Sequence, residues 1–142
     1  MFSFRFFISW IIGAIVMYIA FYLWHGMYLN EINQLNYSKS IFYLFAGITY
    51  IAIAFLISKI FDLGISRKFF SNIFLRGVVS GLFIGFMVFV ITRVSGIGLG
   101  KSLTLEHMLF DFAWQLFEQS CGGIVVSLAT FFIYDPALDE GY

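Results

Sequence analysis

Four long apolar segments occupy most of the chain, at about residues 6–29, 41–61, 74–92 and 108–134 of 142. About 20 apolar residues cross the hydrocarbon core of a bilayer as an α-helix, so each segment is long enough to be a membrane span. The connections, 30–40, 62–71 and 93–107, are too short to hold a folded domain. The sequence therefore predicts an all-α fold. It is a single domain, 1–142, of four transmembrane helices in an up-down-up-down bundle with short loops.

The composition also favours lipid over water as the solvent. Hydrophobic residues make up 61% of the chain and charged residues 11%, whereas a soluble domain carries about 25% charged residues. A small soluble domain leaves roughly a third of its chain surface in water, and a chain this apolar cannot cover that surface with polar groups. The first segment is longer than the apolar region of a signal peptide, about 7–15 residues, so we expect it to stay in place as a span.

Several classes of function are disfavoured by simple counts. The net charge is zero, so no basic patch points to a nucleic-acid partner. A single cysteine, Cys121, excludes an internal disulfide and a cysteine zinc site. The stretch 95–102 falls short of a phosphate-binding loop, because Ser95 stands where the motif needs glycine and a membrane helix precedes it. We expect no cofactor.

The distribution of basic residues predicts the topology. Short loops with more Lys and Arg face the cytoplasm, and with four spans the two termini and the loop 62–71 share one side. That side carries five basic residues and the other side three. The five are Arg5, Lys59, Arg67, Lys68 and Arg76, and the three are Lys39, Arg93 and Lys101. Both termini are therefore expected in the cytoplasm.

Aromatic residues gather around the opposite end of the first two spans, as in an interfacial belt. They are Tyr22, Trp24, Tyr28, Tyr37 and Tyr43. The stretches 22–26 and 114–119 resemble paired motifs of a small four-span bacterial protein. This resemblance implies the bacterial inner (plasma) membrane as the location, and it implies no particular activity.

The third segment contains a helix-packing motif. Gly77, Gly81 and Gly85 repeat every four residues, which makes a flat strip where another helix can approach closely. We expect the strip to pack inside the four-helix unit, with contact between copies of the chain as the alternative.

The fourth segment has a polar face within the membrane. Its members are His107, Asp111, Trp114, Gln115, Glu118, Cys121 and Gly122, opposite an apolar face with Phe112, Leu116, Ile124 and Phe131. At 1.5 Å per residue, Glu118 lies within about 5 Å of the midpoint of the span. A charged group at the bilayer centre costs about 2.5–3.5 kcal/mol on an insertion scale. The sequence therefore predicts that Glu118 faces the bundle interior and not lipid.

The first segment offers a matching stripe. Tyr18, Tyr22, His25 and Tyr28 follow helical spacing. Antiparallel spans one and four bring His25 and Asp111 to similar depths, and Arg93 ends span three on the same side. We therefore predict a polar layer in which His25 and Asp111 are hydrogen-bonded, with Arg93 as a third member. His107 and Glu31 lie further out.

Several interpretations of this layer remain open. The favoured one is a structural polar network, and the second is a proton or ion path or a small-solute site. A metal or haem site has only the spacing of His107 and Asp111 to support it. Ser120 and Cys121 are nucleophiles that no motif supplies with a base. The sequence favours a non-enzymatic structural or accessory subunit, bound to lipid and to other membrane subunits or its own copies. The alternative is a small proton- or ion-coupled transporter or channel that uses Glu118, Asp111 and His25.

Overall fold

The computed structural model describes residues 4–34, 36, 38–66, 71–95 and 104–133. Within these residues the chain is helical apart from short turns. Its elements are α1 (Phe4–Phe21), the π-helix η1 (Tyr22–Tyr28), the 3-10 helix η2 (Glu31–Gln34), α2 (Lys39–Ser66), α3 (Ile73–Val94) and α4 (Leu105–Phe132).

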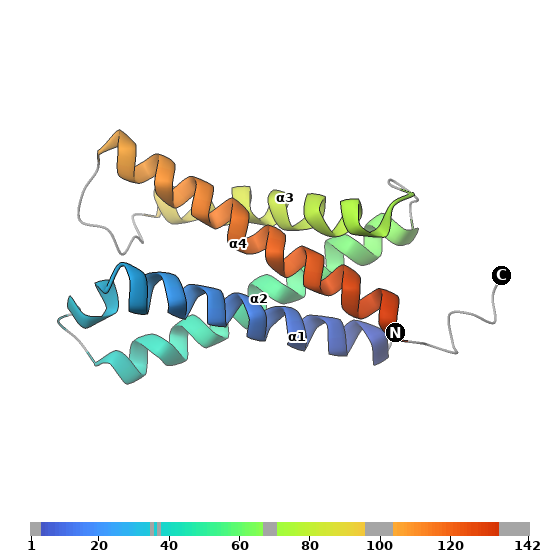
Figure 1. Ribbon diagram of the computed structural model, residues 1–142, viewed down its shortest axis with the longest axis horizontal. Coiled ribbons are helices and arrows are strands. Elements are labelled where there is room, and N and C mark those ends of the chain that lie inside the picture. Colours follow the sequence, from blue (N-terminus) through green and yellow to red (C-terminus); the bar gives the residue numbers. More distant parts are fainter. Residues whose placement is uncertain (1–3, 35, 37, 67–70, 96–103, 134–142) are drawn as a thin grey trace.

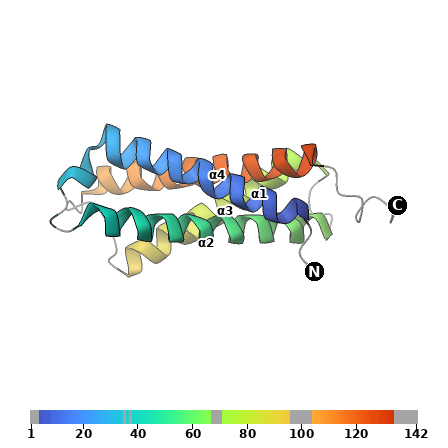
Figure 2. The same cartoon turned by 90° about the horizontal axis from the view of Figure 1, so that it is seen from below.

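The four α-helices run along one long axis and alternate in direction (Figures 1 and 2). α1 begins and α4 ends at one end of the bundle, which we call the terminal end. η1 and the ends of α3 and α4 that face each other across residues 95–104 lie at the opposite end, which we call the loop end. The most extensive interface joins α3 to α4, and α1 packs against both α2 and α4. The predicted all-α bundle is confirmed.

Three of the helices are long and apolar enough to cross a membrane. They are the continuous helix Phe4–Tyr28 that α1 and η1 form, the first 25 residues of α2 (Lys39–Leu63), and α3 (Ile73–Val94). The chain is therefore a helical membrane protein. α4 is as long as α2, with 28 residues, and it packs along α3 and α1. Its polar residues, among them Asp111, Gln115 and Glu118, make it less apolar than the other three.

The largest departure from the predicted spans is in the first helix. The sequence pattern predicts one α-helix to residue 29, but the α-helix ends at Phe21 and the chain continues with π winding. The backbone N–H of Leu29 donates to the carbonyl oxygen of Trp24, five residues back, at 2.8 Å. Asn30 follows with φ 54°, a left-handed conformation that asparagine tolerates better than most residues. Wider winding turns the side chains after Phe21 away from the positions that α-helical spacing predicts.

The other helices extend a few residues beyond the predicted spans or begin earlier. α2 continues to Ser66 and α4 begins at Leu105. α3 has a well-formed start, because Oδ1 of Asn72 accepts hydrogen bonds from the backbone N–H groups of Phe74 and Leu75, at 2.9 and 3.2 Å. Such a cap satisfies N–H groups that have no partner in the helix.

The bundle interior is mainly apolar on the α1 and α2 side, apart from the buried hydroxyls of Ser9 and Ser58. Its fully buried side chains include Met17, Ala54, Ile57 and Phe61, each 0% exposed. Two hydrogen bonds tie α1 to α2. The indole of Trp10 donates to the carbonyl of Ile51 at 2.7 Å, and the hydroxyl of Tyr18 donates to the carbonyl of Tyr43 at 3.3 Å.

Some predicted features lie outside the described residues. They are the stretch 96–103 with its failed phosphate-loop pattern, Tyr37, Arg67, Lys68, Lys101, the tail 134–142, and the side chains of Glu31 and His107.

Candidate functional site: a polar cluster inside the bundle

The glycine strip brings α3 onto the backbone of α4. A methyl group on Gly81 would lie 2.7 Å from the carbonyl carbon of Gln119, and one on Gly77 would lie 2.9 Å from Cβ of Ser127. A methyl group on Gly85 would lie 3.0 Å from the carbonyl oxygen of Gln115. Real Cβ atoms essentially never lie under 3.0 Å from such neighbours, as they would at Gly77 and Gly81, and 3.0 Å at Gly85 is unusually tight, so glycine is what allows the two helices to approach. The structure thus places all three glycines in the interface within the chain.

This approach fixes which side of α4 is buried. The buried residues are Glu118, Gln119, Gly122, Gly123, Val126, Ser127 and Thr130. The predicted polar face is buried only in part, since Asp111, Trp114, Gln115 and Cys121 are half-buried. The buried side of α4 is therefore rotated from the predicted face toward α3, and it includes Gln119.

Two adjacent polar side chains of α4 lie in the middle of the bundle. Glu118 is 1% exposed and Gln119 is 0% exposed. The Tyr50 hydroxyl of α2 and the Trp114 indole lie close enough to Glu118 to interact with its carboxyl group. The side chain of Gln119 packs toward α3, where a methyl group on Gly85 would lie 3.3 Å from its Cγ.

The hydrogen-bonding capacity of this cluster is only partly used. Among the described residues, Oε1 of Glu118, both polar atoms of the Gln119 amide and Nε1 of Trp114 have no hydrogen-bond partner of standard geometry. Oγ of Ser58 on α2 is in the same condition. A buried polar group without a partner destabilises a fold by about 1–3 kcal/mol, so the cluster lowers the stability of the bundle. Such groups require an explanation by chemistry, bound water or a bound ion.

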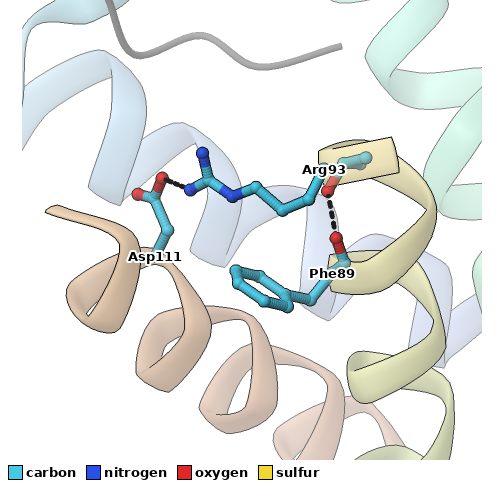
Figure 3. Close-up of polar contacts among 4 residues, drawn as sticks. Phe89, Arg93 and Asp111 are labelled. Carbon is cyan, nitrogen blue, oxygen red and sulfur yellow. Dashed lines mark hydrogen bonds and ion pairs between the residues drawn. The ribbon is translucent and has the colours of Figure 1, made fainter. Parts of the chain in front are cut away.

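An ion pair joins α3 to α4 at the loop end of their interface. The guanidinium of Arg93, in the last turn of α3, donates to the carboxylate of Asp111 on α4 (Figure 3). The two side chains are 26% and 45% exposed. The Arg93 guanidinium also lies 5.3 Å from the centre of the Phe89 ring, one turn earlier in α3. Figure 3 shows Phe89 beneath the extended Arg93 side chain.

The π-helix meets α4 beside this pair. The rings of Trp24 and Trp114 are stacked with centroids 4.1 Å apart, and Tyr28 stacks on Trp24 at 4.8 Å. The ring of His25 lies 5.1 Å from that of Phe21. The contact between Trp24 and Trp114 agrees with the predicted depth match between the end of the first span and the start of the fourth. Whether His25 reaches Asp111 stays a prediction.

The predicted site residues therefore lie in different parts of the bundle. Arg93 and Asp111 are paired, and Glu118 and Gln115 face the interior or its edge. His25 lies in the π-helix near Trp24. The predicted tyrosine stripe relied on α-helical spacing, which π winding replaces after Phe21, and Tyr22 and Tyr28 are 43% and 73% exposed. His107 lies in the first turn of α4, with its side chain outside the described part.

Sequence reasoning did not select two members of the cluster, Gln119 and Tyr50. Tyr50 carries no signal in the sequence, because a tyrosine in an apolar span commonly packs as an aromatic ring. For Gln119 a signal existed. Gln115, Gln119 and Gly123 repeat every four residues in α4, as Gly77, Gly81 and Gly85 do in α3, and antiparallel helices with matching repeats can pack along those rows.

The chemistry open to the cluster is proton exchange and hydrogen bonding. Glu118 can carry a proton, and Gln119 and Trp114 offer donors and an acceptor. Within the described residues there is no group of three or more His, Cys, Asp or Glu that could hold a metal ion. The proposed His107–Asp111 ligand pair is not assessed by this, because the His107 side chain lies outside them. Comparison with protein-family models, curated proteins and solved structures gives no match.

Proposed function

We propose that this chain is a small proton-translocating membrane protein in which Glu118 is the group that binds and releases the proton. The observation that carries the proposal is the buried Glu118 carboxyl, 1% exposed, whose Oε1 has no partner among the described residues. Ionisable groups in the middle of membrane helices are rare, and they commonly mark proton or ion pathways. Beside it, the amide of Gln119 has no hydrogen-bond partner among the described residues, and the indole of Trp114 has none of standard geometry there, so both add sites for water.

The proposed setting follows from the basic residues. Both termini face the cytoplasm of a bacterial cell, in the inner membrane, and the loop end that carries Arg93 and Asp111 faces outward. Asp111 and His25 would then stand between the outside and Glu118. The chain is expected to contact lipid through the exposed apolar sides of its helices and to associate with its own copies or with other membrane subunits.

Proton flux in proteoliposomes tests the proposal. Purified protein is reconstituted with a pH-sensitive dye inside, and a pH gradient is imposed with valinomycin and K⁺ to compensate charge. We expect the wild type to dissipate the gradient faster than protein-free vesicles and Glu118→Gln to lose this activity. Glu106→Gln is the matched control, because it makes the same change at an exposed position of the same helix. Equal flux for wild type and Glu118→Gln, or no flux above empty vesicles, would contradict the proposal.

The second candidate is a non-enzymatic structural or accessory subunit. The observations that favour it are the close α3–α4 packing at the glycine strip and the Arg93–Asp111 pair, because both hold helices in fixed positions. In that case the polar groups of α4 serve only assembly. The same experiment separates the candidates, since a structural subunit carries no proton flux and Glu118→Gln would leave its assembly intact.

A further inference from the structure

The environment of Glu118 differs sharply between its two sides along α4. Toward the terminal end, one turn after Glu118, Gly122 faces the fully buried Met17 of α1, and a methyl group there would lie 2.8 Å from Cγ of Met17. Gly123 faces α3, and a methyl group there would lie 2.9 Å from the carbonyl carbon of Gly77. Both α1 and α3 therefore pack closely against α4 one turn from Glu118, toward the terminal end.

The terminal half remains closely packed beyond those glycines. A methyl group on Gly13 of α1 would lie 3.1 Å from a Val126 methyl carbon. The hydroxyls of Ser127 and Thr130 bond back to carbonyls of their own helix, both at 2.7 Å. Oγ of Ser9 lies 3.2 Å from the Thr130 hydroxyl. Ser58 is the exception, since its buried Oγ has no partner among the described residues.

The loop half is also closely packed where Gly85 meets Gln115, but it differs in its polar groups. Trp114 and Gln115 lie one turn from Glu118 and are half-buried. Nε1 of Trp114 has no hydrogen-bond partner in the described part of the chain. Asp111 lies about 10 Å from Glu118 along the helix at 1.5 Å per residue, and its side chain is 45% exposed. Polar groups thus continue from the carboxyl group to the surface at this end.

We propose that in the conformation of this structure Glu118 exchanges protons with water from the side of the Arg93–Asp111 pair alone, and that proton passage to the terminal side requires the closely packed terminal half to open. This inference rests on the proposed function and adds the direction of access. The titratable groups that interact with Glu118 are Tyr50 of α2 and Cys121 of α4. Next to Glu118 along α4, α1 contributes Met17, which lies against Gly122, and α3 contributes the glycine strip, which lies against Gln119 and Gly123.

Cysteine accessibility to Ag⁺ tests the direction of access without requiring transport. In a Cys121→Ser background, single cysteines are placed by Gln115→Cys in the loop half and Ser58→Cys in the terminal half. Ser58 is chosen in the terminal half because its buried hydroxyl has no hydrogen-bond partner among the described residues, so any water in that half would be expected there. Ag⁺ is added to one side of oriented vesicles, and thiol protection from later alkylation is read by mass spectrometry.

The expected result is protection of Gln115→Cys from the loop side alone, by at least about tenfold in rate over the terminal side, and no protection of Ser58→Cys from either side. Protection of either cysteine from the terminal side, or of neither position from the loop side, would overturn the inference. Adding Glu118→Gln should leave the pattern unchanged. A one-sided pattern without proton flux would refute the proposed function alone, and flux with two-sided protection would refute the one-sided access alone.

Discussion

Replacement of Gly81 by alanine is the most direct perturbation of the α3–α4 interface. The added methyl group would press on the Gln119 carbonyl oxygen and lie 2.7 Å from both its carbonyl carbon and Cα of Ser120. Carbon atoms prefer separations of about 3.5–4.0 Å, so the helices must separate locally by roughly 1 Å. These neighbours are backbone atoms, which cannot rotate out of the way as a side chain would.

The size of the effect follows from this separation. A gap of about 0.5–1 Å loses a quarter to a half of the dispersion energy of each contact, and the gap would extend to Gly77 and Gly85 on the same strip. Overpacking of this kind costs about 1–3 kcal/mol. Alanine recovers up to about 1 kcal/mol through its helix propensity. We expect a net loss of about 1 kcal/mol, or roughly 4 °C in Tm.

Thermal unfolding in mild detergent, followed by circular dichroism, measures the effect. Gly47→Ala is the matched control, because a methyl group there would lie 3.9 Å from the Tyr18 ring, an ordinary contact. Gly47→Ala should leave Tm unchanged or raise it. Similar, small changes for the two variants would show that α3 does not pack on α4 through its glycines, and the argument for the buried side of α4 would fail with it.

Four further predictions test other parts of the chain. A cysteine at Ser66 should resist a membrane-impermeant thiol reagent in intact cells while one at Ser38 reacts, and the reverse pattern would invert the topology. Asp111→Asn should keep the fold and lower the free energy of unfolding by less than about 1 kcal/mol, because the ion pair is partly exposed. A larger decrease would mean that the pair is shielded from solvent. Cysteines at His25 and Asp111, in a Cys121→Ser background, should be joined by a short bifunctional thiol reagent, because a direct disulfide is too short to replace the two longer side chains; absence of the cross-link would remove His25 from the polar layer. Gln119→Met should raise stability by about 1 kcal/mol while Gln115→Met changes it little, and a loss at Gln119 would show that its amide is satisfied in the native protein.

Segment length and hydropathy were enough to predict the bundle. They locate all four helices to within a few residues, because the requirement to cross a bilayer leaves little choice of length. The π-helix after Phe21 could not be predicted, because the energy difference between α and π winding is decided by contacts such as the stack of Trp24 on Trp114. Such contacts join residues far apart in the sequence.

The polar site could be predicted only in part for a related reason. Its charged members, Arg93, Asp111 and Glu118, are conspicuous in an apolar sequence, and depth along antiparallel spans was sufficient to bring Arg93 and Asp111 together. The orientation of α4 about its own axis could not be predicted from its pattern of polar residues alone. It depends on α3, whose glycines draw the backbone at Gln119 into the interface and carry its side chain inside.

The same contact makes the polar cluster costly to keep. The Gln119 backbone is held against Gly81, so the Gln119 side chain cannot turn outward unless the two helices separate. Both polar atoms of its side-chain amide are without a hydrogen-bond partner among the described residues. An apolar side chain of similar volume would fill the site without that cost. Beside it, Glu118 has the same disadvantage. Stability alone would favour apolar residues at both positions, so the presence of a carboxyl and an amide there argues for a role that needs polar atoms in the membrane interior, as proton translocation does.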